Sequence, residues 1–519
     1  MGQKGIVAAG HPETARAATQ ILELGGNAFD AALAALCAAC VAEPLLASLG
    51  GGGFLLAKSE DRGAEIYDFF VQTPRHKPRE GEVDFYPIQA DFGTAQQEFH
   101  IGLGSMAVPG VVAGLFEIHQ RLCRLPLAEI CGPAMNLARH GVEVNEFQHY
   151  ISQILLPILN AAPEAMALAA AGRPGDSIAS AGERVVHPDM ADSFAALIEA
   201  GPDLFYRGEW ADRLVRDCTD RGGLLCRQDL DEYEVQIRDP IRFRSHGARF
   251  LLNSLPSPSG VLVAFAMGLL DSESLAKQPW GSSRHCLALL RAMRTTGAMR
   301  RRLGLERGAP FETALNILDA EQIEYWREEM WQAPLATRGT THISVADQSG
   351  NLASLTISNG EGCAYVLPGT GIMLNNMLGE EDLSPEGFFS WRPNKRMASM
   401  MCPSIAELPD GRQVALGSGG SNRIRSAILQ VLLNVFEFGM TLDQAVQAPR
   451  MHIEDGMLNV EAGFQLSAIA GLSADYEHIC NWPEPNLYFG GVHAVERLPD
   501  GRLGGAGDSR RGGSVAIAN

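Results

Sequence analysis

Apolar and polar positions change their spacing several times along the chain, and the first 50 residues already show both kinds of secondary structure. Gly5 to Ala9 is a short apolar run typical of a strand, and Pro12 suits the first turn of a following helix. The run from Ala31 to Leu49 is almost wholly apolar, but Glu43 and Pro44 interrupt it, and it is too short to cross a bilayer. We therefore expect a buried helix that ends at Leu49.

The middle of the chain has mainly helical spacing. From Pro109 to about Trp331, proline and glycine residues mark the starts and ends of apolar, helix-like repeats. Two short strand-like stretches, Ile241 to Phe243 and Phe250 to Leu252, interrupt this pattern. We predict a helical flank around residues 109–330, followed by an irregular connection from Gln332 to Gly339.

Beyond residue 340 the spacing alternates as it does in strands. His342 to Ala346 and Asn351 to Ile357 are alternating runs joined by a polar turn. Val492 to Val495 and Arg502 to Ala506 resemble another hairpin. The glycine-rich stretch from Gly417 to Arg423 leads into an apolar helix from Ile424 to Phe438. Strands in this number, with helices before and after them, predict a layered sandwich in which helices cover two stacked sheets.

Composition and charge narrow the range of partners. The 519 residues are 46% hydrophobic and 20% charged, an ordinary globular composition, and the net charge of -19 would repel nucleic acid and anionic membranes. We read the basic cluster Arg300-Arg301-Arg302 as the solvated face of a helix. The N-terminal residues enter a domain pattern without the apolar region of a signal peptide, so we expect a cytoplasmic protein.

The cysteines and histidines show no metal-binding spacing. Among ten cysteines only Cys37 and Cys40 form a C-x-x-C pair, and this pair lies in an alanine-rich and leucine-rich helix. Packing in a core explains it better than zinc or redox chemistry. The 13 histidines form no H-E-x-x-H motif. We expect no metal, no other cofactor and no structural disulfide.

The stretch Gly339-Thr340-Thr341 is the strongest candidate for chemistry. A small residue followed by two threonines at the start of a strand suits a chain that cuts itself, because the Thr340 hydroxyl can attack the Gly339 carbonyl. The freed Thr340 amine, with an ordinary pKa of about 7.7 to 8.0, can then act as base for its own hydroxyl. Taken alone, the pair also fits an ordinary strand start, because β-branched residues favour strands.

Four consecutive glycines, Gly50 to Gly53, allow a second chemical interpretation. Backbone N–H groups in such a run can bind phosphate. However, the run lacks the G-K-[ST] ending of a P-loop and does not open a helix as G-x-G-x-x-G does. Tight turning or close backbone approach is the simpler explanation, and nucleotide binding stays an alternative.

Several motifs in order resemble the γ-glutamyltransferases (γ-glutamyltranspeptidases), a family of N-terminal nucleophile hydrolases. The resemblance extends over nearly the whole chain. By this resemblance the chain is identified as a divergent member of the family. The matching stretches are Leu24 to Ala32, Leu49 to Phe54, Gly339 to His342, Gly371 to Asn376 and Gly417 to Arg423.

The resemblance implies an α+β fold, namely a four-layer αββα sandwich. It also implies a precursor that cuts itself into a large segment, residues 1–339, and a small segment, residues 340–519. Acyl transfer then proceeds through a threonyl ester on γ-glutamyl amides, as in glutathione metabolism. By the same resemblance Thr340 is the nucleophile, Thr341 and Ser358 orient it, and the backbone N–H groups of Gly420 and Ser421 form the oxyanion hole.

The substrate-binding positions depart from the family pattern. Phe70 stands where the family has an arginine that clamps the substrate carboxylate, and an apolar ring cannot replace a guanidinium. Ser399 matches the first serine of a Ser-Ser pair, but Met400 occupies the second. Glu380 is the nearest match to the acid that binds the amino group, and Asn359 stands beside the position of the family's asparagine. Four arginines are candidates to replace the clamp: Arg75, Arg79, Arg392 and Arg396.

Three functions follow from these features. The first is a self-processing amide hydrolase or acyltransferase for γ-glutamyl or related acyl amides, including an acylase for a non-glutamyl group. The second is an inactive relative that binds a small ligand, and the third is the nucleotide-binding enzyme. In the first, the partners are a small amide or peptide and the two fragments of the same chain. The sequence leaves the oligomeric state open.

Overall fold

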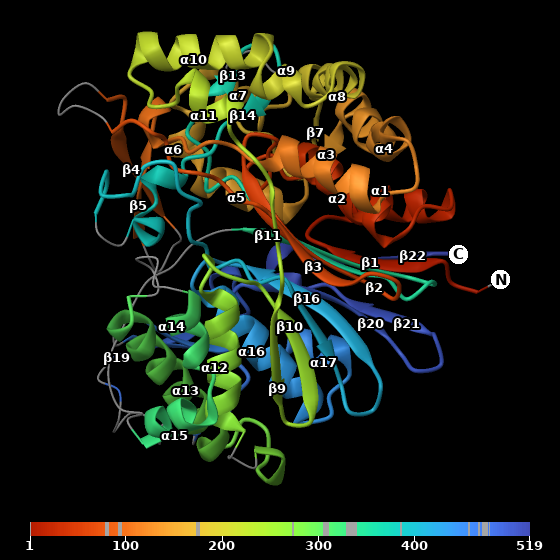
Figure 1. Cartoon of the computed structure of the whole chain (residues 1–519), viewed down its shortest axis with the longest axis vertical. Helices are drawn as coiled ribbons and strands as arrows, with labels where there is room; N and C mark the ends of the chain where they lie inside the picture. Colours follow the sequence, from red (N-terminus) through yellow and green to blue (C-terminus); the bar gives the residue numbers. More distant parts are fainter. Residues whose placement is uncertain are drawn as a thin grey trace.

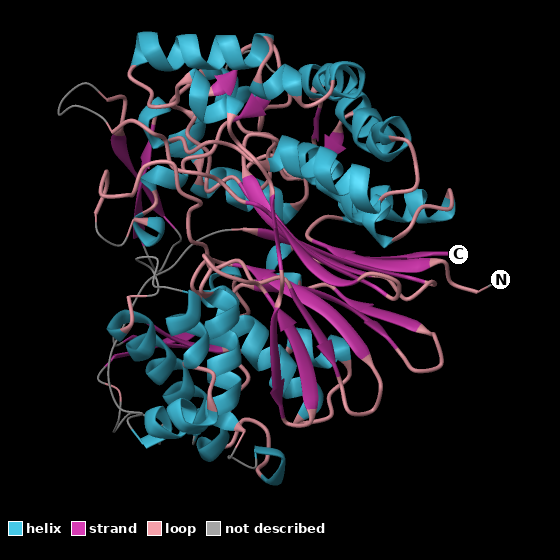
Figure 2. Ribbon diagram, in the orientation of Figure 1, coloured by secondary structure: helices cyan, strands magenta, loops and turns pink. Residues whose placement is uncertain are grey.

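The computed structural model has two sheets that face each other, with helices on both outer sides (Figures 1 and 2). This is the predicted four-layer αββα sandwich, and the fold class is confirmed. The structure describes residues 2–77, 83–91, 96–172, 177–271, 275–304, 311–328, 340–384, 387–454, 457–464, 468–469, 476 and 478–519.

The first sheet combines strands from both ends of the chain. In the described residues its seven antiparallel strands are, in spatial order, β22 (Ser514–Ala518), β1 (Gly5–Ala9), β11 (Thr341–Asp347), β12 (Leu352–Ser358), β2 (Gly52–Ser59), β3 (Gly63–Phe69) and β8 (Gln236–Arg238). β1 lies between β11 and β22, with Val7 opposite both Val345 and Ala516. β11, the strand that follows Thr340, is therefore an interior strand, with β1 on one side and β12 on the other.

The second sheet is antiparallel and six-stranded in the described residues. Its spatial order is β21 (Leu503–Ala506), β20 (Gly491–Arg497), β16 (Gln413–Gly419), β15 (Ser404–Glu407), β10 (Ala248–Leu252) and β9 (Ile241–Ser245). β16 runs into the glycine turn that precedes helix α16 (Arg423–Phe436). β11 packs against both β16 and β20, which brings the start of β11 close to this turn.

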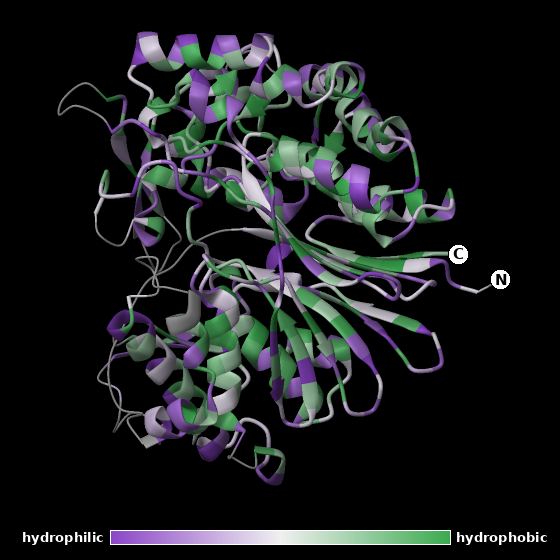
Figure 3. Ribbon diagram, viewed as in Figure 1, coloured by the Kyte–Doolittle hydropathy of each residue, from purple (hydrophilic) through white to green (hydrophobic). Residues whose placement is uncertain are grey.

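Helices cover the outer face of each sheet (Figure 1). Two large clusters of buried apolar side chains pack between the layers, and the ribbon in Figure 3 shows hydrophobic residues along both helices and strands. Over the first sheet lie α1 (Pro12–Glu23), α2 (Ala28–Ala42), α3 (Val111–Leu122), α4 (Leu127–His140) and α8 (Pro188–Ala200). Over the second lie α12 (Ser259–Leu270), α13 (Ser283–Arg302), α16 and α17 (Leu442–Gln447).

The remaining elements surround these layers. The helices are α5 (Glu146–Ile154), α6 (Leu156–Leu159), α7 (Pro163–Ala167), α9 (Asp203–Tyr206), α10 (Glu209–Arg221), α11 (Arg227–Asp231), α14 (Phe311–Asn316) and α15 (Ala320–Glu328). The short strands are β4 (Tyr86–Asp91), β5 (Gln96–Ile101), β6 (Val142–Glu143), β7 (Arg184–Val185), β13 (Val366–Leu367), β14 (Ile372–Met373), β17 (Met451–Glu454), β18 (Met457–Glu461) and β19 (His478–Trp482). The 3-10 helices are η1 (Leu103–Ser105), η2 (Leu275–Lys277), η4 (Met377–Gly379), η5 (Glu381–Leu383), η6 (Leu487–Phe489) and η7 (Ser509–Arg511).

Two local predictions were wrong. The buried helix exists and every residue of α2 is buried, but it ends at Ala42, because Glu43 leaves helical geometry just before Pro44. Arg300 does not lie on a solvated face. Its guanidinium is buried and donates to Asn422 Oδ1 at 2.8 Å, whereas Arg301 and Arg302 are exposed.

The described residues also bear on the expected absences. No helix among them has the length and apolar character needed to cross a membrane. No group of three or more His, Cys, Asp or Glu side chains in the same part of the chain is arranged to hold a metal ion. All ten cysteines are described and are free thiols, and Cys37 packs with its Sγ 3.8 Å from that of Cys131. The predicted connection from Gln332 to Gly339 lies outside the described residues.

Candidate active site

Thr340 lies immediately before β11 and is only 4% exposed. Its carbonyl oxygen accepts a hydrogen bond from Arg511 Nη1 at 3.1 Å. A Cβ atom added to Gly419 at the end of β16 would lie 1.7 Å from the same oxygen, so only glycine fits there. The proposed nucleophile is thus held against the end of the second sheet. Gly339, the other residue of the predicted cleavage site, lies outside the described residues.

The turn after β16 presents backbone N–H groups beside Thr340. Gly420 and Ser421 both have positive φ, +118° and +48°, and α16 begins two residues later. Among the described residues, neither of these two amide groups donates a hydrogen bond. Because they precede a helix N-terminus, they are suited to stabilise negative charge on an acyl oxygen. The Ser421 side chain is used elsewhere, since its Oγ donates to Asp382 Oδ2 at 2.8 Å.

Thr341 points to the opposite side of β11 from Thr340, as the alternation of a strand requires. Its Oγ1 donates to Glu43 Oε2 at 3.0 Å, and Thr14 Oγ1 donates to Glu43 Oε1 at the same distance. Burial raises the pKa of the Glu43 carboxyl to about 7. The hydroxyl predicted to orient the nucleophile therefore bonds to an acid beneath the sheet.

A polar chain between the sheets continues from the site along β11. His342 Nδ1 lies 2.8 Å from Thr356 Oγ1, and His342 Nε2 lies 2.9 Å from Ser344 Oγ. Burial, followed by the nearby His493, lowers the pKa of His342 well below its ordinary value. A Cβ on Gly417 would lie 2.4 Å from the His342 ring. His342 is thus neutral at pH 7, and its partner Ser344 donates to the His493 carbonyl of the second sheet at 3.1 Å.

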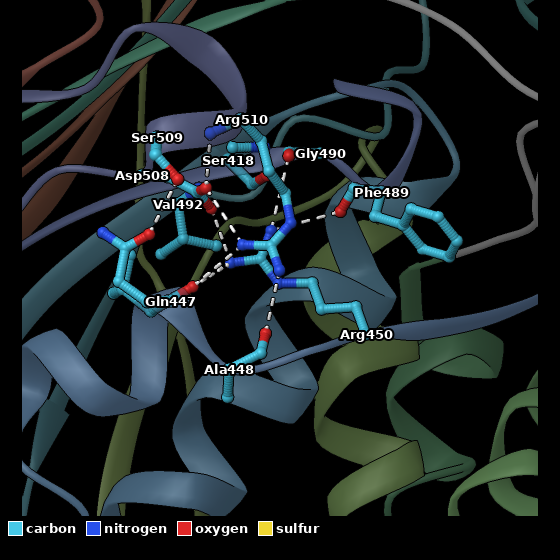
Figure 4. Close-up of polar contacts among 12 residues, drawn as sticks. Ser418, Gln447, Ala448, Arg450, Phe489, Gly490, Val492, Asp508, Ser509 and Arg510 are labelled. Atoms are coloured by element: carbon cyan, nitrogen blue, oxygen red, sulfur yellow. Dashed lines mark hydrogen bonds and ion pairs between the residues drawn. The ribbon is translucent and has the colours of Figure 1, made fainter. Parts of the chain in front are cut away.

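A buried group of charged residues near the C-terminus was missed by the sequence analysis (Figure 4). Asp508 Oδ2 accepts from Arg450 Nη2 at 2.6 Å, and Asp508 Oδ1 accepts from Arg510 Nη1 at 3.1 Å. Arg510 also donates to both oxygens of Glu461, at 2.7 and 2.6 Å. The group places Arg511 beside Thr340. The run Asp508 to Gly513, with two arginines followed by two glycines, was the available signal.

Ser358, Asn359 and Glu380 meet at the end of β12. Ser358 Oγ accepts from the backbone N–H of Gly360 at 3.0 Å. A Cβ on Gly360 would lie 2.4 Å from Glu380 Oε1, so the Glu380 carboxylate lies against this turn. Asn359 is fully buried, and neither its Oδ1 nor its Nδ2 has a hydrogen-bond partner among the described residues. Its amide is therefore a buried polar group with no hydrogen-bond partner in this part of the chain.

The structure also brings Phe70 and Met400, the two residues that depart from the family pattern, near Ser399, which matches it. The backbone N–H of Met397 donates to the Val71 carbonyl at 3.1 Å, which places Phe70 near the Ser399–Met400 segment. The Phe70 ring stacks on Phe54 with 5.4 Å between centroids, and both Phe70 and Met400 are buried in one apolar cluster. Ser399 Oγ accepts from the backbone N–H of Met401 at 3.1 Å.

The candidate replacement arginines are mostly engaged elsewhere. Arg396 donates to Tyr233 Oη at 2.5 Å and to the Phe70 carbonyl, and its Nε lies 3.4 Å from Asp68 Oδ1. Arg75 is paired with Asp229 and Glu232. Arg392 is exposed, and Arg79 lies outside the described residues.

The glycine run of β2 is used for close packing. The N–H groups of Gly50 and Gly51 donate to Ser48 Oγ and O, at 3.1 and 3.0 Å. A Cβ on Gly51 would lie 2.3 Å from the Ser358 carbonyl oxygen, and one on Gly52 would lie 2.8 Å from the backbone nitrogen of Val71. The run therefore brings β12 and the Phe70 segment together. Its first two amides are not available to phosphate.

Comparison with known proteins gives a family match over nearly the whole chain. The family model described as Gamma-glutamyltranspeptidase matches residues 14–518. The acylase ACY 1 proenzyme of Pseudomonas sp. (strain V22) is 32% identical over 100% of this chain and 94% of its own length. The glutathione hydrolase proenzyme of Pseudomonas aeruginosa is 29% identical over 86% of this chain and 82% of its own length.

Solved structures share the fold. The crystal structure of cephalosporin acylase from Bacillus halodurans superposes with a TM-score of 0.85 at 23% identity, covering 99% of this chain and 96% of that chain. Helicobacter pylori gamma-glutamyltranspeptidase gives a TM-score of 0.54 at 21% identity, covering 63% and 91%. The chain therefore belongs to the gamma-glutamyltranspeptidase family, whose members are amide hydrolases and acyltransferases of the N-terminal nucleophile type.

Proposed function

We propose that this enzyme is an acylase that cuts itself before Thr340 and then prefers acyl groups without the α-carboxylate of glutamate. The observation that carries the proposal is the apolar wall of Phe70 and Met400 at the place where the family binds that carboxylate. A buried carboxylate without a partner is costly. Arg396, the nearest candidate to compensate, is already bound by Asp68 and Tyr233.

The reaction needs only groups that surround Thr340. The Thr340 Oγ attacks the amide carbonyl while the α-amine of the same residue takes the hydroxyl proton. The N–H groups of Gly420 and Ser421 stabilise the oxyanion. The proton then passes to the leaving amine as the C–N bond breaks, which leaves a threonyl ester. Water or a second amine attacks this ester and frees the acyl group.

Asn359 and Glu380 keep one polar contact point in the acyl site. The unpartnered amide of Asn359 can both donate and accept. Glu380 supplies a carboxylate next to it, which suits an amino or hydroxyl substituent. An acyl chain with a polar substituent, but with an apolar surface toward Phe70, fits both sides. Glutathione, a γ-glutamyl amide, is a poorer candidate substrate.

The two fragments are expected to stay together after cleavage. β1 comes from residues 1–339 and is flanked on both sides by strands from residues 340–519. Separating the fragments would break these ladders and expose the shared core. We further propose a cytoplasmic location. We also propose small amide substrates rather than nucleic acid, because the net charge of -19 would repel a phosphate backbone.

A set of four chromogenic anilides tests the acyl preference. After a denaturing gel has shown the two fragments, γ-glutamyl, 4-aminobutanoyl, glutaryl and pentanoyl anilides are compared by kcat/KM. The 4-aminobutanoyl group differs from γ-glutamyl only by the lost carboxylate, and the glutaryl group only by the lost amine. We expect the compounds without the carboxylate to react at least as fast as their matched partners. A tenfold or greater preference for γ-glutamyl over 4-aminobutanoyl would refute the proposal.

A further inference from the structure

Arg511 is a buried cation next to the nucleophile. It is 4% exposed, and no carboxylate among the described residues lies within ion-pair distance of it. Its Nη1 donates to the Thr340 carbonyl at 3.1 Å and its Nη2 to the Leu487 carbonyl at 3.2 Å, while its Nε has no acceptor among the same residues. A buried charge without a counter-ion is unfavourable for folding, so it calls for another explanation.

The surrounding structure fixes Arg511 in this position. The adjacent Arg510 is bound by Asp508 (Figure 4) and by Glu461, so the short η7 helix cannot shift without breaking buried ion pairs. A Cβ on Gly491 would lie 2.6 Å from the Arg511 side chain, and one on Gly420 would lie 3.5 Å from its Nη2. Glycines on both sides thus make room for the guanidinium next to the oxyanion turn.

We propose that Arg511 is a positioning residue that fixes the Thr340 carbonyl and keeps the Thr340 α-amine neutral after cleavage. This rests on the proposed function, because the amine exists only in the cut chain. The contact is with the carbonyl of the same residue, so the guanidinium and the amine are separated by only a few bonds of Thr340. Two positive charges at that separation repel each other, and the neutral amine is the form that can accept the hydroxyl proton.

Other charged groups near the N-terminal end of β11 do not cancel the repulsion between Arg511 and the Thr340 amine. Burial and then the neighbouring Arg423 lower the pKa of Arg511 to about 10, so Arg511 is still charged at neutral pH. Arg423 at the start of α16 adds positive charge, and Glu361 and Asp508 act in the opposite sense. The titratable groups on the remaining sides are His342 and His493 between the sheets, and Asp382 and Glu380 beyond Ser421 and Gly360.

The test compares Arg511→Gln with Arg511→Lys in the cut enzyme. The pH dependence of kcat/KM is measured with the best anilide of the series. We expect the acid limb of Arg511→Gln to move to higher pH by about one unit, because the amine regains its ordinary pKa of about 7.7 to 8.0. Arg511→Lys keeps a positive charge and should return the limb toward that of wild type. Arg502→Gln is the control. The Arg502 side chain is 74% exposed, and its removal should leave the pH profile unchanged.

A second measurement covers the case in which Arg511→Gln does not fold. The Thr340 amine of the wild-type enzyme is labelled with an amine-reactive reagent across pH, and its modification is followed by mass spectrometry of the small fragment. A midpoint below the ordinary α-amine range supports the proposal, and a midpoint within or above that range overturns it. An equal loss of rate at every pH in Arg511→Gln would indicate a structural role only. An uncut wild-type chain would refute the proposed function itself and the role of Arg511 with it.

Discussion

Two buried arginines beside the site, Arg396 and Arg511, differ in what surrounds them. Arg396 lies over the Tyr233 ring at 4.7 Å, next to the Asp68 carboxylate, and donates to two backbone carbonyls. Arg511 has two carbonyl acceptors and no carboxylate in ion-pair contact among the described residues. The positive charge of Arg396 therefore lies beside a carboxylate, whereas that of Arg511 lies beside the candidate nucleophile Thr340.

This contrast between the two arginines corresponds to a difference between the candidate catalytic groups and the acyl-binding positions. The candidate groups for bond breaking, Thr340 and the turn at Gly420 and Ser421, lie together next to the buried charge of Arg511. At the proposed acyl-binding positions Phe70 and Met400 are apolar and buried, whereas Asn359 and Glu380 are polar. Selection of the acyl group and activation of the nucleophile can thus be altered separately.

The largest effect is expected at Thr340. Thr340→Ala removes both the group that cuts the chain and the group that attacks substrate, so the chain should stay whole and anilide hydrolysis should fall by at least about a thousandfold. Thr340→Ser keeps a hydroxyl and should be cut more slowly. A denaturing gel and initial rates check both variants. A cut Thr340→Ala chain would mean that another residue is the nucleophile.

A matched pair of substitutions, Asp508→Asn and Asp68→Asn, sharpens the comparison of the two arginines. Burial alone would raise the pKa of Asp508, but Arg450 and Arg510 lower it, so the group is a carboxylate at neutral pH. Asp508→Asn leaves the two buried guanidinium groups of Arg450 and Arg510 without this carboxylate. It should reduce the free energy of unfolding by about 3 to 5 kcal/mol. Because η7 also carries Arg511, self-cleavage should slow.

Asp68→Asn removes the carboxylate that pairs with Arg396 and Arg238. Its partner Arg238 has a side-chain exposure of 28%, so solvent can compensate part of the loss. We expect a smaller loss of stability than in Asp508→Asn and no change in self-cleavage, measured by urea unfolding and by gel. Equal slowing of cleavage in both variants would show that the two regions are not separable.

Sequence patterns could predict the parts of this candidate site that are local. Thr340, the turn at Gly420 and Ser421, and the alternating strands follow from runs of adjacent residues, and the αββα fold follows from their order together with the family resemblance. The helix end at Ala42 was misplaced because the apolar run continues past it, although Glu43 and Pro44 marked the position.

Contacts between distant residues could not be predicted in the same way. Thr341 and Glu43 are 298 residues apart, and Arg450 and Asp508 are 58 apart. Their pairing depends on how β11, α2 and β20 pack, which no local spacing reveals. Arg300 was placed on the surface for the same reason, since its buried acceptor Asn422 lies 122 residues away.

A substitution at Glu43 tests whether a charged carboxylate destabilises the fold on the face of β11 opposite Arg511. Its pKa in the folded protein is about 7, above the ordinary value of 4.5, so between these pH values only the unfolded chain releases the proton. Wild-type stability should therefore fall as pH rises from about 4.5 to 7. Glu43→Gln cannot ionise and should gain roughly 3 kcal/mol relative to wild type over this window. Urea unfolding at pH 4.5 and 7.5 measures this, and parallel pH dependences would contradict it.

Asn359 should give the smallest effect and the clearest separation of binding from stability. Its amide has no partner among the described residues, so Asn359→Ala removes an unsatisfied buried group and should leave the melting temperature unchanged or higher. KM for the preferred anilide should rise up to about tenfold, as expected for one lost hydrogen bond. Asn375 is the matched control, because its amide donates to the Gly50 and Ala107 carbonyls at 2.8 and 3.0 Å. Asn375→Ala should lower the melting temperature, and an equal loss in both variants would show that the Asn359 amide serves the fold rather than the substrate.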